Sequence, residues 1–354
     1  MEIIYFPDTQ DRFQPCKIEA GTYQDRSQPC KTVAEKVVAT IGFFDGVHLG
    51  HCHLIRMLRQ MAEERGMASA VITFERHPRQ VLGSDWQPQL LTTLEEKKSL
   101  IEAAGVDRLI ILRFNRKMAA LTARDFMEQV LLSQLGVKVL VTGYDNRFGH
   151  NRTEGFTDYV QYGREMGMEV VSGTPLTLTD GGKISSSVIR RLLQEGDVAG
   201  ASQCLGRPYT LSGTVVSGQH IGTELGFPTA NLRLNEPLKL IPKAGVYAVE
   251  VSFPSTFSSQ HTSPTLHPAM MNIGTRPTFD GQNQTLEVHL FNYMGNLYGQ
   301  PLTVNFCHWL REERRFDSCE QLVSQLQHDA ERTKELLSIH HSPFTTNPSP
   351  NHDL

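Results

Sequence analysis

The first half of the chain alternates short apolar runs with amphipathic segments. The apolar runs have the length and composition of buried strands and lie at residues 37–41, 70–74, 108–112, 137–141 and 169–171. Between them, helical spacing is shown by Leu54, Leu58 and Met61 before a stop at Gly66, and by residues 92–105, 122–136 and 153–167. This alternation predicts an α/β, Rossmann-like domain in which parallel strands are joined by right-handed helical crossovers.

The pattern changes beyond Cys204. Segments of alternating polarity, typical of half-buried strands, lie at residues 209–217, 245–252, 269–273, 285–293 and 302–309. Turn residues separate them and no helical pattern intervenes, which predicts an antiparallel β-barrel or sandwich. Residues 316–337 then form one amphipathic helical pattern. We therefore predict an antiparallel β-barrel domain with a C-terminal helix.

Three regions follow from this division. We predict one domain over residues 1–204, a second over 205–337 and a disordered, proline-bearing tail over 338–354. Residues 254–268 are rich in Ser, Thr, Pro and His and are predicted to form a long loop between strands. A length of 354 residues agrees with two domains.

Composition narrows the class of protein. With 34 basic and 38 acidic residues the net charge is 34 − 38 = −4, which argues against a dedicated nucleic-acid-binding protein. No apolar run is long enough to span a bilayer and the N-terminus does not resemble a signal peptide, so we expect a cytoplasmic protein without a membrane partner. The six cysteines include no Cys-x-x-Cys pair, which favours free thiols over a zinc site or disulfide framework.

One local oddity has no functional explanation. The segment 11–17, Asp-Arg-Phe-Gln-Pro-Cys-Lys, is echoed at 25–31 as Asp-Arg-Ser-Gln-Pro-Cys-Lys. We interpret it as a small duplication in a surface segment.

Candidate chemistry begins in the glycine-rich turn after the run 37–41. Gly42, Gly46 and Gly50 allow a tight turn and the close approach of a ligand, and the next helical pattern starts at once. His48 and His51 therefore lie where a strand passes into a helix whose N-terminus favours phosphate. Two imidazoles there can donate hydrogen bonds to a phosphoryl group that gains negative charge. A plain glycine turn with two surface histidines, or half a metal site, remains an alternative.

Two further loops are predicted to join this turn. In a parallel sheet the ligand lies beyond the carboxyl ends of the strands, where the loops at 73–78 and 143–149 also gather. The second loop contains Asp145 and Arg147 between two glycines. A polar turn without function is the alternative interpretation of that loop.

A serine triplet forms another candidate phosphate site. Ser185, Ser186 and Ser187 stand at a helix start, with Arg190 on the first turn of that helix. The same residues are also compatible with an ordinary serine N-cap on a surface helix.

The second half contains two candidate features. The hydroxyl of Thr229 and the amide carbonyl of Asn231 are oxygen ligands that suit Mg²⁺ beside substrate phosphates, although a proline turn with a polar cap explains them as well. In the segment 285–291, Glu287 and His289 share one face, and the pattern alone is also that of a solvated strand face.

Taken together, these motifs resemble a known family. His48-Leu-Gly-His51 is similar to the His-x-Gly-His signature of nucleotidyltransferases, and with Phe44, Asp45 and Gly46 before it the stretch looks like the bacterial bifunctional riboflavin kinase/FAD synthetase family. The segments Gly-Tyr-Asp at 143–145, Ile-Ser-Ser-Ser at 184–187, Phe-Pro-Thr-Ala-Asn at 227–231 and Glu-Val-His at 287–289 follow in family order. The resemblance extends from about Val37 to Leu337.

The resemblance implies an enzyme of flavin cofactor synthesis. The barrel half is expected to phosphorylate riboflavin with ATP to give FMN. The α/β half is expected to transfer AMP from a second ATP to FMN, which gives FAD and pyrophosphate. Mg²⁺ is the implied cofactor and ATP the co-substrate, so the expected partners are ATP, riboflavin, FMN and FAD.

The resemblance also implies site residues. Those with catalytic roles are His48, His51, Asp145 and Glu287, the last as general base of the kinase step. Those expected to bind ATP or phosphate are Gly42, Phe44, Asp45, Gly46, Gly50, Ser185, Ser186, Ser187, Arg190, Gly213, Gly218, Gly226 and Pro228. Those expected to contact the flavin are His77, Arg147, Arg311 and Phe316, and the metal is assigned to Thr229 and Asn231.

The chain departs from the family pattern at a few positions. Phe43 stands where Asn is common, Arg76 where Pro is usual, Asn146 where an aromatic residue is usual, and Thr223 where a basic residue is usual. The sequence leaves two other functions open: a nucleotidyltransferase with a single activity on another phosphate acceptor, and a non-catalytic flavin-binding protein. It does not give the oligomeric state.

Overall fold

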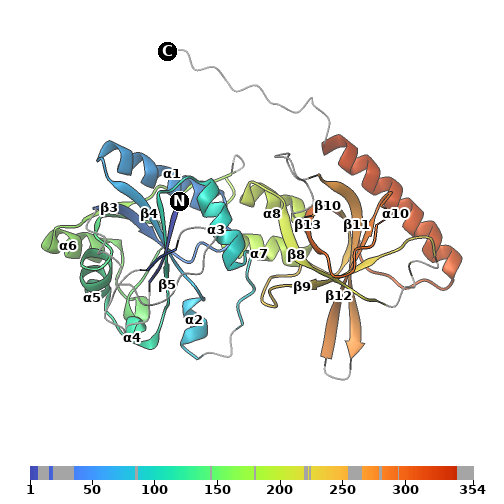
Figure 1. Ribbon diagram of the computed structural model, residues 1–354, viewed down its shortest axis with the longest axis horizontal. Helices are drawn as coiled ribbons and strands as arrows, with labels where there is room; N and C mark the ends of the chain where they lie inside the picture. The colour runs from blue at the N-terminus through green and yellow to red at the C-terminus, as the bar shows by residue number, and fades with distance from the viewer. Residues whose placement is uncertain are drawn as a thin grey trace, which may run out of the picture. The chain divides into compact units, whose positions relative to one another are not determined.

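The computed structural model describes residues 1–6, 16–18, 36–83, 87–143, 146–178, 181–218, 222, 225–253, 265–278, 281–293 and 295–340. Within it, the chain divides into two compact units, Met1–Ser186 and Ser187–Leu354, and the division falls in the first turn of a helix (Figure 1). The predicted boundary between catalytic domains, at residues 204 and 205, stays a prediction.

The first unit is built on a seven-stranded sheet in the order β2-β1-β5-β4-β3-β6-β7. Its strands are β1 (Glu2–Phe6), β2 (Cys16–Ile18), β3 (Val37–Ile41), β4 (Ala68–Phe74), β5 (Arg108–Leu112), β6 (Val137–Thr142) and β7 (Glu169–Ser172). All neighbours are parallel except β1 and β2. All five residues of β3 are buried, as expected for a strand at the centre of a sheet that is covered on both faces.

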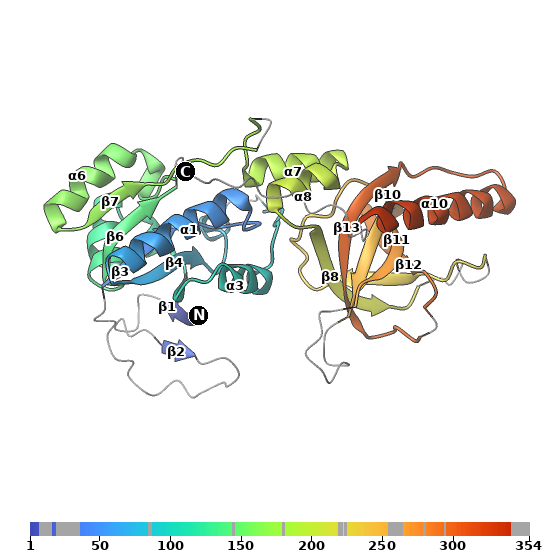
Figure 2. The same cartoon turned by 90° about the horizontal axis from the view of Figure 1, so that it is seen from above.

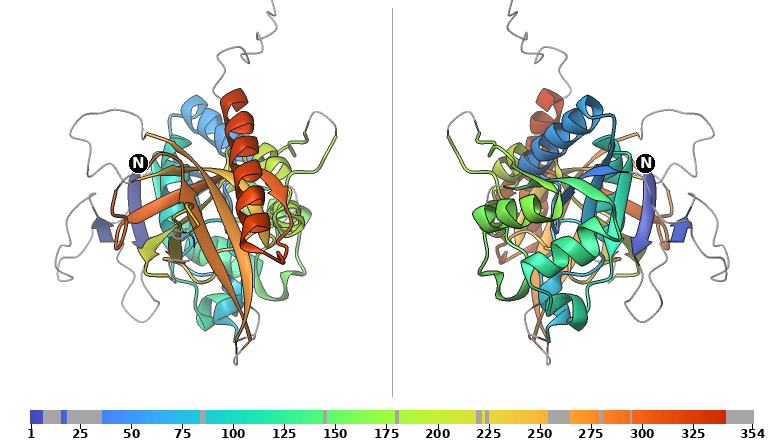
Figure 3. Two further views of the ribbon diagram at one scale, coloured as in Figure 1. Left: turned by 90° about the vertical axis from the view of Figure 1, so that its right-hand side faces the viewer. Right: turned by 90° about the vertical axis from the view of Figure 1, so that its left-hand side faces the viewer.

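Helices cover both faces of this sheet (Figure 3). They are α1 (Leu49–Glu64), α2 (Pro78–Val81), α3 (Leu94–Ala103), α4 (Arg116–Ala119), α5 (Ala123–Asp125), the π-helix η1 (Phe126–Leu132), the 3₁₀ turn η2 (His150–Arg152) and α6 (Phe156–Met166). One core cluster contains Leu58 of α1 and Ile101 of α3. The other contains Met127 of η1 and Tyr159 of α6.

The predicted α/β architecture is confirmed, with local differences. Helical hydrogen bonding over 122–136 is mostly of the π type and ends at Leu132, and α6 begins at Phe156 rather than at residue 153. The sequence pattern missed β1 and β2. β1 is short and amphipathic, and its place beside β5 depends on long-range pairing, which local periodicity does not show. Part of the 11–31 duplication lies in β2, and the rest lies outside the described residues.

The second unit is a closed antiparallel barrel in the order β10-β11-β12-β9-β8-β13 (Figure 2). Its strands are β8 (Tyr209–Val216), β9 (Ala230–Leu234), β10 (Gly245–Ser252), β11 (His267–Thr278), β12 (Gly281–Leu290) and β13 (Pro301–Arg311). The barrel prediction is confirmed, but β9 was missed because its five residues follow a proline-bearing turn and give too short a pattern. Of the predicted loop 254–268, residues 254–264 lie outside the described residues and β11 already begins at His267.

Helices α7 (Ser186–Glu195), α8 (Val198–Leu205) and α10 (Cys319–His340) accompany the barrel. α8 packs on β8 and β13, whereas α10 packs on β10, β11 and β13. The amphipathic pattern from residue 316 is confirmed as a helix that starts at Cys319 and continues to His340, so the predicted tail from 338 begins within it. Residues 341–354 lie outside the described part. None of the helices in that part is long and apolar enough to cross a membrane.

Candidate active sites

The glycine-rich turn between β3 and α1 has an unusual backbone. Gly46 has a φ of 83°, which glycine adopts freely, but Phe44 and Val47 also have positive φ values, of 52° and 37°. For a β-branched residue such as Val47 this conformation is strained and persists only if the surroundings hold it. Phe44 and Val47 are both buried, so packing fixes the turn from one side.

Hydrogen bonds fix the turn from the other side. The carboxylate of Asp45, which is 3% exposed, accepts the backbone N–H groups of Leu91 and Thr92 at 3.0 Å and the Thr92 hydroxyl at 3.2 Å. The same hydroxyl oxygen accepts the N–H of Gly46 at 3.0 Å. Thr92 immediately precedes Thr93, the N-cap of α3, so these hydrogen bonds connect the turn to the start of α3.

The other predicted loops reach the same turn. The Thr73 hydroxyl donates to the carbonyl of Phe43 at 3.1 Å, and the Asn146 amide donates to the carbonyl of Ile41 at 2.5 Å. The Ser186 hydroxyl donates to the carbonyl of Asp45 at 2.8 Å. The structure therefore brings together the turn, the end of β4, the loop after β6 and Ser186.

His48 and His51 lie side by side at the start of α1. His48 is the N-cap, and its Nδ1 atom accepts the N–H of His51 at 3.3 Å. The two rings stack with centroids 3.6 Å apart. Burial, followed by the charges of His48 and Lys97, holds the pKa of His51 well below its ordinary value of 6.5. His51 is therefore neutral at pH 7.

Lys97 is a site residue that the sequence interpretation missed. It lies on α3, is 2% exposed, and places its Nζ atom 3.8 Å from the centroid of the Phe43 ring. Burial lowers its pKa to about 8, partly opposed by the charge of Asp45. A lysine in register with Leu94 and Ile101 on the apolar stripe of a helix was the available signal.

The remaining predicted residues of this unit are placed as follows. His77 is the N-cap of α2, and its ring meets the Phe43 ring edge-on at 4.7 Å between centroids. Arg147 is exposed, and its carbonyl accepts the Nε–H of Arg152. Asp145 lies outside the described residues. Gly42 and Gly50 are closely flanked by the rings of Phe44 and His48, so a larger residue at either position would disturb the turn.

Arg190 and Ser187 belong to the second unit, on the first turn of α7. Ser185 and Ser186 belong to the first unit. The serine triplet therefore spans the division between the two units.

In the barrel, a row of polar side chains crosses three strands. Asn231 of β9 is paired with Glu287 of β12, which is paired with Asn272 of β11. Residues directly opposite each other in antiparallel strands share a face and lie within reach of one another. The neighbouring residues Leu286 and Val288 are buried in the barrel, so the row lies on its outer face. The predicted alternation of β12 is confirmed.

Glycines let the chain approach this row closely. A Cβ atom at Gly218 would lie 2.0 Å from Nδ2 of Asn231, and one at Gly213 would lie 2.4 Å from the carbonyl oxygen of Arg233. Gly226 has a φ of 80° in the turn before Pro228. The Pro228 carbonyl accepts a hydrogen bond from Nδ1 of His289 at 2.8 Å, which ties the turn that contains Thr229 to β12. Thr223 lies outside the described residues.

The donor atoms of this face fit a hard cation. Thr229 and Asn231 offer neutral oxygens, and Glu287 adds a carboxylate beside Asn231. Among the described residues, no group of three His, Cys, Asp or Glu side chains is placed to hold a metal ion. A divalent ion here would therefore take most of its ligands from substrate phosphates and water.

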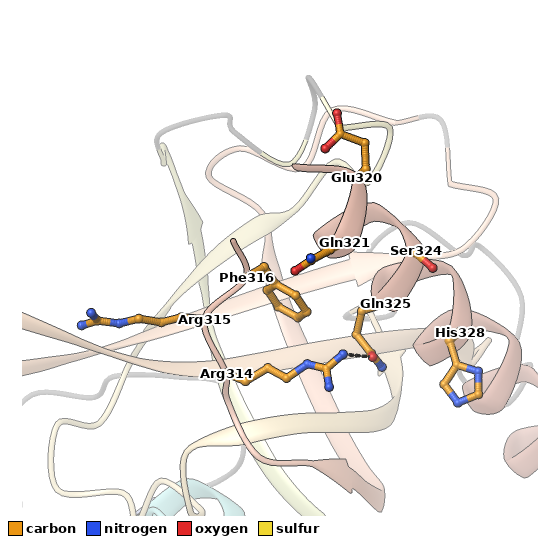
Figure 4. Close-up of a pocket in the computed structure, with 8 residues that line it drawn as sticks. All are labelled: Arg314, Arg315, Phe316, Glu320, Gln321, Ser324, Gln325 and His328. Carbon is orange, nitrogen blue, oxygen red and sulfur yellow. Dashed lines mark hydrogen bonds between the residues drawn. The ribbon is translucent and has the colours of Figure 1, made fainter. Parts of the chain in front are cut away.

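A pocket of about 750 Å³ lies between the segment after β13 and the first turns of α10 (Figure 4). Its lining residues are Arg314, Arg315, Phe316, Glu320, Gln321, Ser324, Gln325 and His328. Figure 4 shows Phe316 and Arg314 turned toward the helix, where Arg314 donates to Gln325, while Arg315 points away. The pocket thus combines an aromatic ring with amide and cationic groups.

Arg311 does not line this pocket but braces it. Its guanidinium donates from Nε and Nη2 to the Asp329 carboxylate of α10 at 2.9 and 2.8 Å, and Asp329 is 3% exposed. Its Cζ atom lies 5.8 Å from the centroid of the Phe316 ring. Arg311 therefore links the end of β13 to α10 at the base of the pocket.

Two family models match the chain. The model for FAD synthetase covers residues 30–188, and the model for riboflavin kinase covers residues 205–337. The two matches fall on the two differently folded parts of the chain.

Relatives over nearly the full length agree. The chain is 39% identical over 306 residues to the bifunctional riboflavin kinase/FMN adenylyltransferase of Haemophilus influenzae, covering 86% of this chain and 96% of that one. It is 36% identical over 310 residues to the protein of the same name from Bacillus subtilis, with coverage of 86% and 93%. A crystal structure from Streptococcus pneumoniae, described as a macrolide-efflux protein, matches with a TM-score of 0.76 and 31% identity over 85% of this chain and 95% of that one.

Proposed function

Because the chain belongs to the family of bifunctional riboflavin kinase/FMN adenylyltransferases, we propose that its two reactions are divided between residues 1–204 and 205–337. The enzyme phosphorylates riboflavin with ATP to give FMN and then transfers AMP from ATP to FMN to give FAD and pyrophosphate. The observation that supports the division is the match of the FAD synthetase model to the α/β part and of the riboflavin kinase model to the barrel.

In the adenylyl transfer, an oxygen of the FMN phosphate attacks the α-phosphorus of ATP. The bond from that phosphorus to the bridging oxygen breaks, and pyrophosphate leaves. The nucleophile is already an anion, so the protein has to position groups and neutralise charge rather than remove a proton. We assign contacts with the α- and adjacent phosphates to His48 and His51, because both lie at the N-terminus of α1 beside the strained turn.

The turn itself is assigned to phosphate binding through its backbone. Asp45 fixes the conformation of the turn by accepting the Leu91 and Thr92 amides, which leaves Gly42, Gly46 and Gly50 to approach the nucleotide. The ring of Phe44, packed against the ring of His51, supports that histidine. Ser185, Ser186, Ser187 and Arg190 are assigned to the departing pyrophosphate.

FMN is assigned to the opposite side of the turn. His77, whose ring contacts Phe43, and the exposed Arg147 are the proposed flavin contacts, and Asp145 is the proposed residue for orienting substrate or water. Both flavin contacts flank the end of the sheet at which the loops of β4 and β6 meet the turn.

In the kinase step, Glu287 is the proposed general base for the terminal hydroxyl of riboflavin. A carboxylate beside the transferring phosphoryl group can accept the hydroxyl proton as the new P–O bond forms. Thr229 and Asn231 would hold a Mg²⁺ ion, which when bound neutralises charge on the ATP phosphates. Gly218, Gly226 and Pro228 are assigned to the turn that approaches those phosphates, and Gly213 lets β8 approach β9 closely beside it.

The flavin of the kinase step is assigned to the pocket lined by Phe316. Its aromatic ring provides a stacking surface, and Arg311 holds the segment after β13 against α10. We further propose that the enzyme works in the cytoplasm on these soluble substrates, without a nucleic-acid or membrane partner. A net charge of −4 and the absence of a membrane-spanning helix from the described residues support this.

A product assay tests the proposal. Purified enzyme is incubated with riboflavin, ATP and Mg²⁺, and FMN and FAD are separated by chromatography over time. FMN followed by FAD supports the assignment, and the double variant His48→Ala/His51→Ala should still form FMN but no FAD. Glu287→Gln should form FAD from supplied FMN but no FMN from riboflavin. Loss of both activities in either folded variant would overturn the division.

A further inference from the structure

We propose that Lys97 is a phosphate-binding catalytic residue of the adenylyl transfer site, where its ammonium contacts the acceptor phosphate of FMN. The inference rests on the proposed function of the first unit. It concerns a lysine that lies on a helix outside the glycine-rich turn, the serine triplet and the loops after β4 and β6.

The surroundings of Lys97 do not explain a buried ammonium as a structural ion pair. The residue is 2% exposed, and within the described part of the chain its Nζ atom rests on the Phe43 ring without a hydrogen bond or ion pair. The charge of the nearby Asp45 carboxylate partly opposes the fall in the pKa of Lys97, but that carboxylate accepts its hydrogen bonds from the Leu91 and Thr92 amides and the Thr92 hydroxyl. A lysine buried in this way is costly unless it has a partner, and a substrate anion would supply one.

The position of Lys97 indicates which substrate phosphate it contacts. On one side it meets Phe43, whose ring contacts His77, the residue assigned to the flavin. On the other side its charge is felt by His51, which is assigned to the nucleotide. The ammonium therefore lies near residues assigned to the flavin and to the nucleotide, and the FMN phosphate must meet the α-phosphorus where these two substrates meet.

The chemistry needs a cation at this point. The FMN phosphate and the ATP phosphates repel each other, and a buried positive charge offsets that repulsion in the transition state. Lys97 keeps its proton throughout, because the phosphate oxygen that attacks is already anionic and the leaving pyrophosphate needs no proton from the lysine. The lowered pKa of about 8 makes this contribution sensitive to pH just above neutrality.

Other titratable groups near Lys97 could also make the activity depend on pH. Asp45 faces it from the turn after β3, His51 faces it from α1 with His48 beside it, and His77 contacts the Phe43 ring. On its own helix, Glu96 is engaged in capping Thr93. Since the pKa of His51 lies well below 6.5, a change in activity above pH 7.5 points to Lys97 rather than to His51.

Three variants test whether the charge of Lys97 or only its bulk matters for activity. Lys97→Met removes the charge but fills the space, Lys97→Arg keeps a charge that does not titrate, and Lys98→Met is the matched control. Lys98 is the next residue on the same helix, and its Nζ atom is paired with Glu95 at 2.6 Å. Denaturant unfolding of the first unit, followed on the same samples, reports whether each variant is folded, because Lys97 lies in that unit.

The measurement is the steady-state rate of FAD formation from FMN and ATP between pH 6.5 and 9.5. For Lys97→Met we expect kcat/KM for FMN to fall about a hundredfold at pH 7, with KM for ATP changed less than about twofold. Wild-type kcat/KM for FMN should decline above pH 8, by about thirtyfold at pH 9.5, and Lys98→Met should follow the same curve. Lys97→Arg should lose that decline.

Two results would overturn the inference. One is a Lys97→Met enzyme whose kcat/KM for FMN stays within about threefold of wild type. The other is an equal effect on the KM values for ATP and FMN, which would indicate a structural role. If Lys97→Arg is inactive because the larger side chain does not fit, the KM values for ATP and FMN in Lys97→Met still distinguish phosphate binding from a structural role. If the His48 and His51 variants still synthesise FAD, the proposed adenylyl transfer site is wrong. If those variants lose FAD synthesis but Lys97→Met keeps it, only the role proposed for Lys97 is wrong.

Discussion

The imidazole rings of His48 and His51 stack within 16° of parallel, 3.6 Å apart between centroids, at the first turn of α1. Burial of the ring, together with the charges of His48 and Lys97, keeps the pKa of His51 well below 6.5. At neutral pH His51 is thus an uncharged imidazole, so the phosphate contact proposed for it would be a hydrogen bond rather than an ion pair.

The depressed pKa of His51 links pH to stability. In the unfolded chain His51 protonates near pH 6.5, whereas in the folded protein it stays neutral to a much lower pH. The unfolded state therefore binds more protons below pH 6.5, and stability falls as the pH drops through that range. We expect wild-type enzyme to lose more thermal stability between pH 7.5 and 5.5 than His51→Asn. Equal losses in calorimetry would contradict the prediction.

Thr92 provides a test of how the strained turn is held. Thr92→Val keeps the shape of the side chain but removes the acceptor of the Gly46 N–H and a donor to Asp45. A buried group left without its partner costs about 1–3 kcal/mol, so the free energy of unfolding of the first unit should fall by that amount. FAD formation should fall with it, while FMN formation from riboflavin is unchanged.

The matched control is Thr92→Ser, which keeps the hydroxyl and should retain most FAD synthesis. If the valine and serine variants behave alike in denaturant titration and product assay, the hydroxyl does not hold the turn.

The sequence could predict the segments that form the proposed adenylyl transfer site, but not the long-range hydrogen bonds that hold them together. The turn, the two histidines and the serine triplet follow from local motifs, and the meeting of the turn with the loops at 73–78 and 143–149 follows from the topology of a parallel sheet. The bonds from Asp45 to Leu91 and Thr92 cross 46 and 47 residues and leave no local trace. For the same reason β1, which is defined by its pairing with the distant strand β5, was missed.

Lys97 was missed for a different reason. Its place on the apolar stripe of α3 was visible, but a long lysine on such a stripe commonly extends its ammonium to solvent. Only the structure shows that the ammonium stays inside, on the face of Phe43.

Gly218 offers a test confined to the barrel. A Cβ atom there would lie 2.0 Å from Nδ2 of Asn231, so Gly218→Ala must displace the Asn231 side chain from the row shared with Glu287. We expect riboflavin phosphorylation to fall at least about tenfold, since a displacement of about 1 Å in a positioning group has effects of this size or larger. FAD formation from supplied FMN should be unaffected.

Gly299 is the control for this change. It lies in the same unit, and a Cβ atom added there would meet no other atom of the described residues within 4 Å. Its φ is 73°, a conformation that Asn tolerates. Gly299→Asn should therefore keep kinase activity. A Gly218→Ala enzyme as active as Gly299→Asn would show that Asn231 has no positional role in the kinase step.

The contact between Arg311 and Asp329 allows stability to be tested separately from the flavin binding proposed for the pocket next to α10. Asp329 is 3% exposed and receives two N–H groups from Arg311 and one from Gln325. Removing the guanidinium leaves a buried carboxylate without its charge partner, which costs about 3–5 kcal/mol. We expect Arg311→Met to destabilise the second unit by that amount, and Arg311→Met/Asp329→Asn to recover much of the loss because no charge is left buried.

Riboflavin affinity, measured by fluorescence quenching, should recover in the double variant if Arg311 acts through α10. Recovery of stability without recovery of affinity would instead place the guanidinium in contact with the flavin.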